Sequence, residues 1–519
     1  MQFEMDKEEF VDKIKTCEKP VIARLCMKIK AKTTPLQVYT GLCSSNSYLL
    51  ESVEKGSYHA RFSFVGYDPD VIITLKDRRI RLDSRNKRLG NWINLNLDGV
   101  CKDSSILDGF DSIDALRAAF PTANGVNFLG RTIFDRQTFL GGAIGYLAYD
   151  LVYDCWLEKE RLESERKISN IPDAQFALTT KTIVFDHKTD FIHVILTPFV
   201  TAEDDPCKVY EAAEKDALKI VSKIENSKEN SSSPLTAKKG GLNELKSNMS
   251  KEEYERIVTV GKKHIMDGDI FQVVLSMRYE GEIGLSPLDI YRRLREVNPS
   301  PYMYLFKFGD LGIIGASPET LLTVHNRRVI TNPIAGTCPR GKTDEEGEEL
   351  ARAMLADEKE RAEHVMLVDL GRNDVRMVSK PGTVKVDDFM SVLKYSHVQH
   401  IESTVSGELR NECDQFDATR AIFPAGTLSG APKIRAMEII DAQENDSRGI
   451  YGGGVGYYSW DGDADFAIVI RTVVTEGNRA YVQAGAGIVA DSDPESEYYE
   501  VERKMAAMRR AIELAGADR

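Results

Sequence analysis

The chain has 519 residues, of which 42% are hydrophobic, and its 81 acidic against 68 basic side chains give a net charge of −13. This negative charge argues against nucleic acid or an anionic membrane surface as the main partner, and no apolar run approaches the roughly 20 residues of a membrane span. The charged N-terminal segment MQFEMDKEEF lacks a signal peptide's apolar region, and eight single cysteines without a CxxC pair indicate neither a disulfide framework nor a zinc site, so we expect reduced thiols in a cytoplasmic protein.

The first part of the chain is rich in strands. Runs of β-branched and aromatic residues with partial alternation predict strands at residues 47–53, 61–67 and 70–84. Residues 182–198 predict a hairpin that turns at residues 187–190. Helical patterns occupy residues 112–120 and 207–224.

A polar stretch over residues 226–250 interrupts these patterns. It is rich in Ser, Lys, Asn and Gly and has few large apolar residues. Such a composition is typical of a linker or a long surface loop. We therefore expect two halves, residues 1–225 and residues 251–519.

The second half mixes helices with hairpins. Ser250 and Glu253 form the pattern of a capping box at the start of a helix. A hairpin is expected over residues 466–489, turning at residues 476–478, and a terminal helix follows with Asp493 as N-cap, Pro494 as first residue and Gly516 as its stop. Strands in hairpins with helices outside them predict an α+β fold.

Two carboxylate pairs, 137 residues apart, have the spacing of neighbours on one helix face. The pairs are Glu360 with Glu363 and Glu497 with Glu500. Either pair alone could be a solvated helix face, and first-turn acids can be purely structural. Four carboxylates that converged in a folded core would repel one another unless a hard cation with oxygen ligands lay between them.

Glycine-rich segments occur at residues 424–433, 452–454 and 485–490. The last, GAGIVA, matches a dinucleotide-binding pattern, but no βαβ unit surrounds it, so we reject a nucleotide site. These glycines either let backbone amides approach a ligand carboxylate or serve only tight turns. His397 and His400 lie three apart on an expected strand, so they would face opposite sides, and a structural role remains open for either.

Taken in order, many segments resemble the chorismate-utilising enzymes, and among them the large subunits of anthranilate synthases. The resemblance is carried by GDIFQVVLS (268–276), NPSPYMYLFKF (298–308), GASPETL (315–321), NPIAGTCPRG (332–341), DEKERAEHVMLVDLGRNDV (357–375), HVQHIES (397–403), FPAGTLSGAPK (423–433), YGGGVGYYS (451–459), IRT (470–472) and QAGAGIVADSDPESEYYE (483–500). Shorter matches at residues 48–54 and 141–152 extend it into the first half. The family resemblance implies two intertwined halves built on antiparallel sheets that form a sandwich flanked by helices.

The resemblance implies that residues 251–519 bind chorismate together with Mg²⁺. Glu363 and Glu500 match the direct metal ligands, and Glu360 and Glu497 match those that reach the ion through water, which suits an ion that keeps several waters. Further matches to substrate-binding residues are Gly336, Thr427, Tyr451, Arg471, Gly485, Gly487 and Lys504.

The resemblance also implies the chemistry. Glu319 matches the general acid that protonates the departing ring hydroxyl when ammonia adds, and His400 matches the residue implicated in the elimination of pyruvate. Relatives that make isochorismate or salicylate carry a water-activating lysine where this chain has Gln272. Aminodeoxychorismate synthases carry a nucleophilic lysine where this chain has Ala335. Both absences favour anthranilate as the product.

Residues 1–225 are expected to carry a tryptophan-regulatory segment. The matching residues are Leu50, Glu51, Ser52, Asn298, Pro301, Tyr302 and Met303, although the same segments could be an ordinary strand end and loop. Cys338 replaces the family's more usual arginine. No amidotransferase sequence follows the terminal helix, so a separate glutamine amidotransferase subunit (component II) in a heterotetramer is expected. The alternatives are an aminodeoxychorismate synthase and a non-catalytic tryptophan-sensing subunit.

Overall fold

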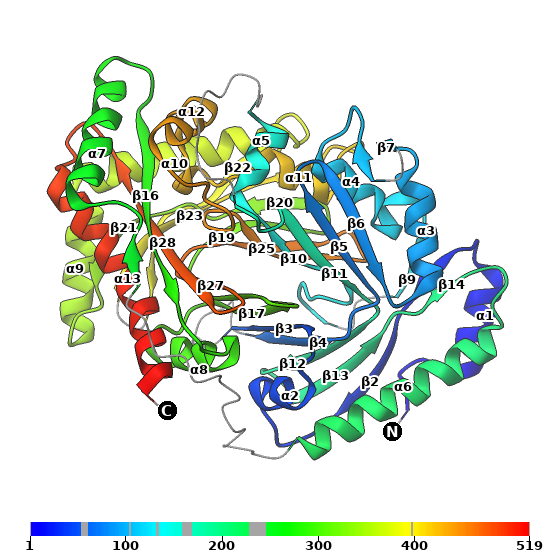
Figure 1. Ribbon diagram of the computed structural model, residues 1–519. Coiled ribbons are helices and arrows are strands. Elements are labelled where there is room, and N and C mark those ends of the chain that lie inside the picture. Colours follow the sequence, from blue (N-terminus) through cyan, green and yellow to red (C-terminus); the bar gives the residue numbers. More distant parts are fainter. Residues whose placement is uncertain are drawn as a thin grey trace.

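Two large antiparallel sheets lie face to face as a sandwich, with helices on their outer surfaces (Figure 1). The computed structural model describes residues 2–52, 61–102, 105–130, 134–157, 169–227, 245–395 and 398–517. The expected α+β fold with two intertwined halves is confirmed. Within the described ranges, no helix is both long and apolar enough to cross a membrane.

The first sheet has 12 strands in the described chain and combines both halves. In spatial order they are β15 (Lys246–Ser247), β16 (Gln272–Glu282), β28 (Arg479–Ile488), β27 (Thr472–Glu476), β18 (Leu311–Ser317), β17 (Tyr302–Phe308), β3 (Asn46–Glu51), β4 (Phe62–Tyr67), β12 (Lys181–Asp186), β13 (Phe191–Leu196) and β2 (Leu25–Ile29), with β24 (Gly430–Ala431) beside β16. The halves meet where β17 pairs with β3.

The second sheet has 13 described strands. Their order is β21 (Ile334–Pro339), β23 (Val398–Glu408), β20 (Arg328–Thr331), β19 (Thr320–His325), β26 (Ala464–Ile468), β25 (Gly454–Ser459), β10 (Gly142–Leu147), β11 (Ala174–Thr179), β5 (Val71–Lys76), β6 (Arg79–Ser84), β8 (Ile106–Leu107) and β7 (Cys101–Lys102), with β22 (Lys385–Lys394) beside β23. Here the halves meet where β10 pairs with β25. A small third sheet joins β14 (Phe199–Val200), β1 (Val21–Ala23) and β9 (Asn127–Leu129).

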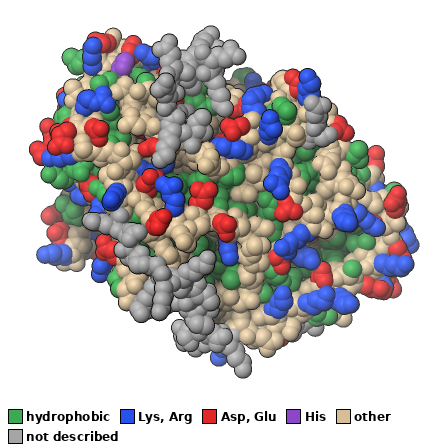
Figure 2. Space-filling model, viewed as in Figure 1, with side chains coloured by type: hydrophobic (Ala, Val, Ile, Leu, Met, Phe, Trp, Pro, Cys, Tyr) green, Lys and Arg blue, Asp and Glu red, His purple; other side chains and the backbone are tan. Residues whose placement is uncertain are grey.

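The helices form layers outside the two sheets (Figure 1). They are α1 (Lys7–Thr16), α2 (Pro35–Leu42), α3 (Lys87–Leu97), α4 (Ser112–Ala118), α5 (Val152–Cys155), α6 (Pro206–Asn226), α7 (Lys251–Met266), α8 (Pro287–Val297), α9 (Asp344–Ala356), α10 (Glu358–Arg376), α11 (Gln415–Ile422), α12 (Lys433–Gln443) and α13 (Pro494–Ala517). The space between the sheets is filled by an aromatic-rich core that includes Tyr48, Phe64, Phe139, Phe306 and Tyr457. On the face drawn in Figure 2, acidic and basic side chains are interspersed.

Several local expectations are confirmed. The chain turns between β12 and β13 at residues 187–190, and Ser250 and Glu253 form a complete capping box on α7. Asp493 accepts a hydrogen bond from the backbone N–H of Ser496 in the first turn of α13. Of the expected linker, residues 228–244 lie outside the described residues, while α6 continues to Asn226 and Lys246–Ser247 already belong to a sheet.

Two boundaries differ from the sequence-based expectation. The hairpin was expected from residue 466, but Ala464–Ile468 belong to the second sheet and only β27 and β28 form the hairpin in the first. Both strands are buried, so the apolar pattern continues across the crossing at residues 469–471 and does not mark it. Gly516 lies inside α13 and does not adopt the left-handed conformation of a helix stop.

Candidate active site

The first carboxylate pair lies on α10, which packs against the second sheet. Asp357 caps this helix by accepting from the backbone N–H groups of Lys359 and Glu360. Glu360 and Glu363 are half-buried on the same face. One residue further, buried His364 lies 2.7 Å from Ser403 Oγ on β23 through its Nε2 atom. This contact fixes the rotation of the helix, and therefore the direction in which its carboxylates point.

The second pair lies near the start of α13, on the side of the first sheet. Glu497 and Glu500 are both half-buried. Lys504, one turn later, forms an ion pair with Glu500 Oε1 at 2.7 Å and donates a hydrogen bond to the carbonyl of Gly485 on β28 at 3.0 Å. The lysine thus attaches this helix face to the glycine-rich strand.

The four carboxylates are close enough to influence one another. Burial raises the pKa of Glu363, and the charges of Glu360 and Glu500 raise it further. Burial also raises the pKa of Glu360, with contributions from Asp357 and Glu500. The pKa of Glu497 is raised by burial and by Glu500. The two helices, predicted from sequence only as separate amphipathic segments, therefore direct their acids into one region.

This donor set suits a hard cation. It offers only carboxylate oxygens, which Mg²⁺ and Ca²⁺ prefer. No three of these four glutamates bring their oxygens within 4.8 Å of one another in the described structure. The four side chains as they lie therefore do not offer three direct carboxylate ligands to one point.

Gln272 connects the carboxylates to the first sheet. It begins β16, is 3% exposed, and donates from Nε2 to Glu363 Oε1 at 3.2 Å. Its Oε1 atom is buried and has no hydrogen-bond partner. A Cβ at Gly487 on the neighbouring strand would lie 2.6 Å from the Gln272 amide nitrogen, so only glycine leaves room for this side chain.

Glu319 is a buried acid between β18 and β19. Its Oε1 atom accepts a hydrogen bond from the Thr427 hydroxyl at 2.8 Å. Burial raises the pKa of Glu319 to about 7, although this hydrogen bond and the charges of Arg471 and Lys504 oppose the shift. The raised pKa favours the protonated form, which a general acid requires.

His400 faces the same region from β23. Its Nδ1 atom lies 2.8 Å from the carbonyl oxygen of Gly336 and 3.0 Å from Thr337 Oγ1. Because a carbonyl only accepts, Nδ1 carries the proton. Burial lowers the pKa of His400, and repulsion from Arg471 and Lys504 lowers it further, so the ring is neutral with its lone pair on Nε2. That atom is buried without a partner. His397 lies outside the described residues.

Arg471 lies where the chain crosses between the sheets. It has φ of 50°, a left-handed conformation that is uncommon for a residue other than glycine. Burial lowers its pKa, while Tyr395 and Glu319 favour its charge. Tyr451 is buried nearby, and a Cβ at Gly485 would lie 2.9 Å from the Tyr451 hydroxyl. The absence of a side chain at Gly485 therefore lets the Tyr451 hydroxyl lie against β28.

Gly336 is a further position where glycine is required. Its φ is 66°, and a Cβ there would lie 3.0 Å from Glu360 Oε2. Cys338, two residues on, packs in a small apolar cluster with Met354 and Ile401. The replacement of a basic residue at Cys338 is thus accommodated in an apolar cluster.

A separate pocket contains most of the residues that were matched to tryptophan regulation. Leu50 and Glu51 on β3 and Ser52 directly after it line the pocket together with Pro301, Tyr302 and Met303, and it holds about 700 Å³ of empty space, part of it open to solvent. The two segments meet because Met303 pairs with Glu51 and Tyr304 with Leu50 across β17 and β3.

Asn298 differs from this group, because it caps the end of α8 and does not line the pocket. Its side-chain nitrogen is buried without a hydrogen-bond partner. The pocket also has lining residues that sequence comparison of short motifs missed, among them Arg136, Gln137 and Asp465. They come from two distant segments, the loop before β10 and strand β26, and form no local motif.

Comparison with a family model and comparison with individual proteins point to the same group of enzymes. A family model described as chorismate binding enzyme matches residues 111–510. The chain is 47% identical to "Anthranilate synthase component 1" of Haloferax volcanii, over 98% of this chain and 97% of that protein, and 40% identical to the protein of that name from Pseudomonas aeruginosa, with 93% of each covered.

Solved structures are similar over nearly the whole chain. Anthranilate synthase component I from Streptococcus pneumoniae superposes with a TM-score of 0.70 at 35% identity, covering 92% of this chain and 98% of that one. The isochorismate synthase MenF from Escherichia coli shares the fold, with a TM-score of 0.64 at 18% identity, covering 97% of this chain and 99% of that one.

Thr427→Val should raise the pKa of Glu319 above its present value of about 7. The change removes a donor that favours the carboxylate. We expect a rise of roughly one to two units, since a hydrogen bond to a charged group contributes about 1.5–3 kcal/mol and one unit corresponds to about 1.4 kcal/mol. Isotope-edited NMR titration of glutamate-labelled chain, assigned with Glu319→Gln, measures it.

Thr475→Val is the matched control, because the Thr475 hydroxyl is buried without a partner. It should leave the titration of Glu319 unchanged. An unchanged or lower pKa in Thr427→Val would show that the hydroxyl does not act on this carboxyl.

Proposed function

The chain belongs to the family of chorismate binding enzymes, and from this premise we propose that it is the large subunit of an anthranilate synthase, converting chorismate and ammonia to anthranilate and pyruvate. The residue that distinguishes this reaction from related ones is Gln272. At this position a lysine would activate water, but here a neutral amide binds Glu363. Ala335 likewise offers no nucleophile. Ammonia therefore adds directly to the ring.

The four glutamates fit Mg²⁺. Glu363 and Glu500 would ligate the ion directly, and Glu360 and Glu497 would bind its waters. The unpaired, buried Oε1 of Gln272 adds a polar atom at the same place. When bound, the ion supplies positive charge that lets the ring carboxylate of chorismate enter an acidic site.

The second carboxylate of the substrate, on the enolpyruvyl group, requires its own binding groups. Arg471 and the Tyr451 hydroxyl are available, together with the backbone near Gly485 and Gly487. Lys504, which donates to the Gly485 carbonyl, adds positive charge near the ring carboxylate instead. Gly336 and Thr427 border the ring. These groups orient the substrate between Glu319 and His400.

In the first step, the nitrogen of ammonia bonds to the ring carbon beside the carboxylate. The ring hydroxyl leaves as water with the proton of Glu319, and the surplus proton on nitrogen returns to the Glu319 carboxylate. In the second step, the Nε2 lone pair of His400 accepts the proton from the carbon that now bears nitrogen. The ring becomes aromatic as pyruvate departs, protonated at its methylene carbon. The neutral state of His400 in the structure suits a base.

Ammonia supply and regulation complete the proposal. A separate glutamine amidotransferase subunit would supply ammonia, and the two kinds of subunit would associate as a heterotetramer. Tryptophan would bind the pocket lined by Leu50 and Tyr302 and inhibit the reaction.

The direct test incubates the purified chain with chorismate, Mg²⁺ and ammonium, with and without tryptophan. The proposal predicts fluorescent anthranilate that depends on both Mg²⁺ and ammonium and decreases with tryptophan. An amino-deoxy product instead would indicate an aminodeoxychorismate synthase, and tryptophan binding without turnover would indicate a sensing subunit.

Glu363→Gln should lower Mg²⁺-dependent turnover by at least about 100-fold, since it removes a charged ligand from the ion. Glu358→Gln, an exposed acid in the first turn of the same helix, is the matched control and should keep its activity. Circular dichroism should show that both variants fold. Retained turnover in Glu363→Gln would refute the metal assignment.

His400→Ala should stop the reaction between its two steps. We expect the amino-deoxy intermediate to accumulate, because the elimination loses its base while the first step does not use Nε2, and general base catalysis contributes about 10²–10⁴-fold. Chromatography of the products measures both species. Normal anthranilate formation, or equal loss of both steps, would remove this role.

Leu50→Ala should weaken tryptophan inhibition without changing kcat or KM for chorismate. Leu50 lines the regulatory pocket, and the loss of its apolar contacts should cost about 1–2 kcal/mol of tryptophan affinity, or roughly tenfold. Leu36→Ala on α2, outside this pocket, is the control. Inhibition by tryptophan that is unchanged in Leu50→Ala would place the regulatory site elsewhere.

A further inference from the structure

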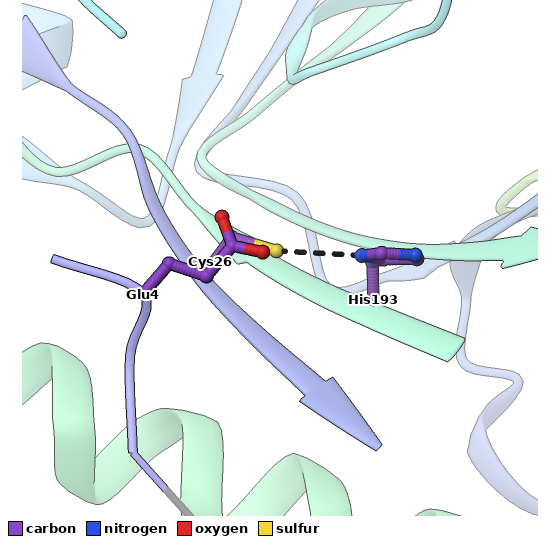
Figure 3. A group of neighbouring side chains, drawn as sticks. All are labelled: Glu4, Cys26 and His193. Atoms are coloured by element: carbon purple, nitrogen blue, oxygen red, sulfur yellow. Dashed lines mark hydrogen bonds between the residues drawn. The ribbon is translucent and has the colours of Figure 1, made fainter. Parts of the chain in front are cut away.

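Three side chains at the edge of the first sheet form a second cluster of potential metal ligands, distinct from the glutamates of the active site. Glu4, Cys26 and His193 each offer a ligand atom, and these atoms lie within 4.8 Å of one another (Figure 3). Within the described ranges, no other group of three such side chains is as close. The three residues are widely separated in the sequence and form no local sequence motif.

The backbone holds the three residues in register. Glu4 donates its N–H to the carbonyl of Cys26 at 2.9 Å, and Phe3 forms a bridge with Met27. On the other side, β2 pairs with β13, so that Cys26 lies opposite Ile195 and diagonal to His193. The cluster therefore rests on a sheet and on the arm that leads into α1.

The distance between the sulfur and nitrogen atoms fits a tetrahedral ion. Cys26 Sγ lies 3.7 Å from His193 Nδ1. Sulfur at about 2.3 Å and nitrogen at about 2.0–2.1 Å from Zn²⁺, at a tetrahedral angle, would be about 3.6 Å apart. Cys26 is 1% and His193 5% exposed, whereas Glu4 is exposed and leaves a path for an ion to enter.

The charge balance also permits an ion. Arg24 Nη1 lies 3.6 Å from Glu4 Oε2, and Lys28 and Arg61 add positive charge near His193, opposed by Asp186. The carboxylate of Glu4 and a Cys26 thiolate together carry the two negative charges that balance a divalent cation, so the ion-bound cluster is neutral beside these basic groups.

Without a bound ion, both buried ligand groups, the Cys26 thiol and the His193 ring, are uncharged. Burial, aided by Lys28, lowers the pKa of His193 to about 4, so its ring is neutral and can donate a lone pair. Burial raises the pKa of the Cys26 thiol to about 12. The thiol therefore gives up its proton to solvent only when the metal–sulfur bond forms.

We propose that Glu4, Cys26 and His193 bind one Zn²⁺ ion, with water as the fourth ligand. Sulfur and imidazole ligands favour Zn²⁺, whereas the all-oxygen set of the active site favours Mg²⁺. The ion fastens the N-terminal arm and α1 to β2, the strand at the end of the first sheet (Figure 1). This proposal is independent of the reaction that the active site performs.

The test uses the full chain, stripped with a chelator and dialysed against Zn²⁺ alone. We expect one equivalent of bound zinc, and Co²⁺ in its place should give a thiolate-to-metal charge-transfer absorption. Cys26→Ser should lose both signals. Cys43→Ser, which changes an exposed cysteine outside the cluster, should keep both. No bound zinc in the parent chain, or unchanged binding in Cys26→Ser, would overturn the proposal.

Because Cys26 is buried, Cys26→Ser can lose zinc through misfolding alone. Glu4→Ala is a second test without this problem, because Glu4 is exposed. It should weaken zinc affinity at least about tenfold while its circular dichroism stays that of the parent chain. Zinc should raise the melting temperature of the parent chain but not of Cys26→Ser. Glu363→Gln should bind zinc normally, and loss of zinc in this variant would show that the ion occupies the active site instead.

Discussion

Mutual repulsion among four carboxylates is the constraint on which this site depends. Glu360 and Glu363 approach from one helix and Glu497 and Glu500 from another. Burial, with further contributions from neighbouring acids, raises the pKa of Glu360, Glu363 and Glu497. Each helix is therefore anchored independently of the acids, α10 by the contact of His364 with Ser403 and α13 by Lys504 on the Gly485 carbonyl. Secured in this way, the helices keep four negative charges in place for a cation to neutralise.

The crossing of the chain between the two sheets organises the rest of the site. It places Arg471 in a left-handed conformation and lets its charge reach Glu319. The pocket lined by Leu50 and Tyr302 shares the same framework, because the hydroxyl of Tyr302 donates to Asp465 on β26 at 3.0 Å and lies 3.0 Å from the hydroxyl of Thr320, the residue after Glu319. The pocket and Glu319 thus adjoin the same turn, between β18 and β19.

Sequence patterns predicted the local elements well, whereas the roles of the site residues come from the family resemblance and stay predictions. The capping box at Ser250 and the helices bearing the four glutamates follow from short-range rules. The crossing at residues 469–471 was missed, because both flanking strands are buried and show no change of pattern. Contacts between distant segments were also beyond reach, such as Asp465 in the pocket and His193 beside Cys26. Such contacts depend on strand order, which local periodicity does not encode.

We propose that these carboxylates bind Mg²⁺ together with the anionic ring of the substrate. Calorimetric titration of Mg²⁺ into the chain, with and without chorismate, tests it most directly. Each ligand should strengthen binding of the other by the same factor, because the coupling between two bound ligands is reciprocal. If the Mg²⁺ affinity does not change when chorismate is present, the ion and the substrate do not bind at one site.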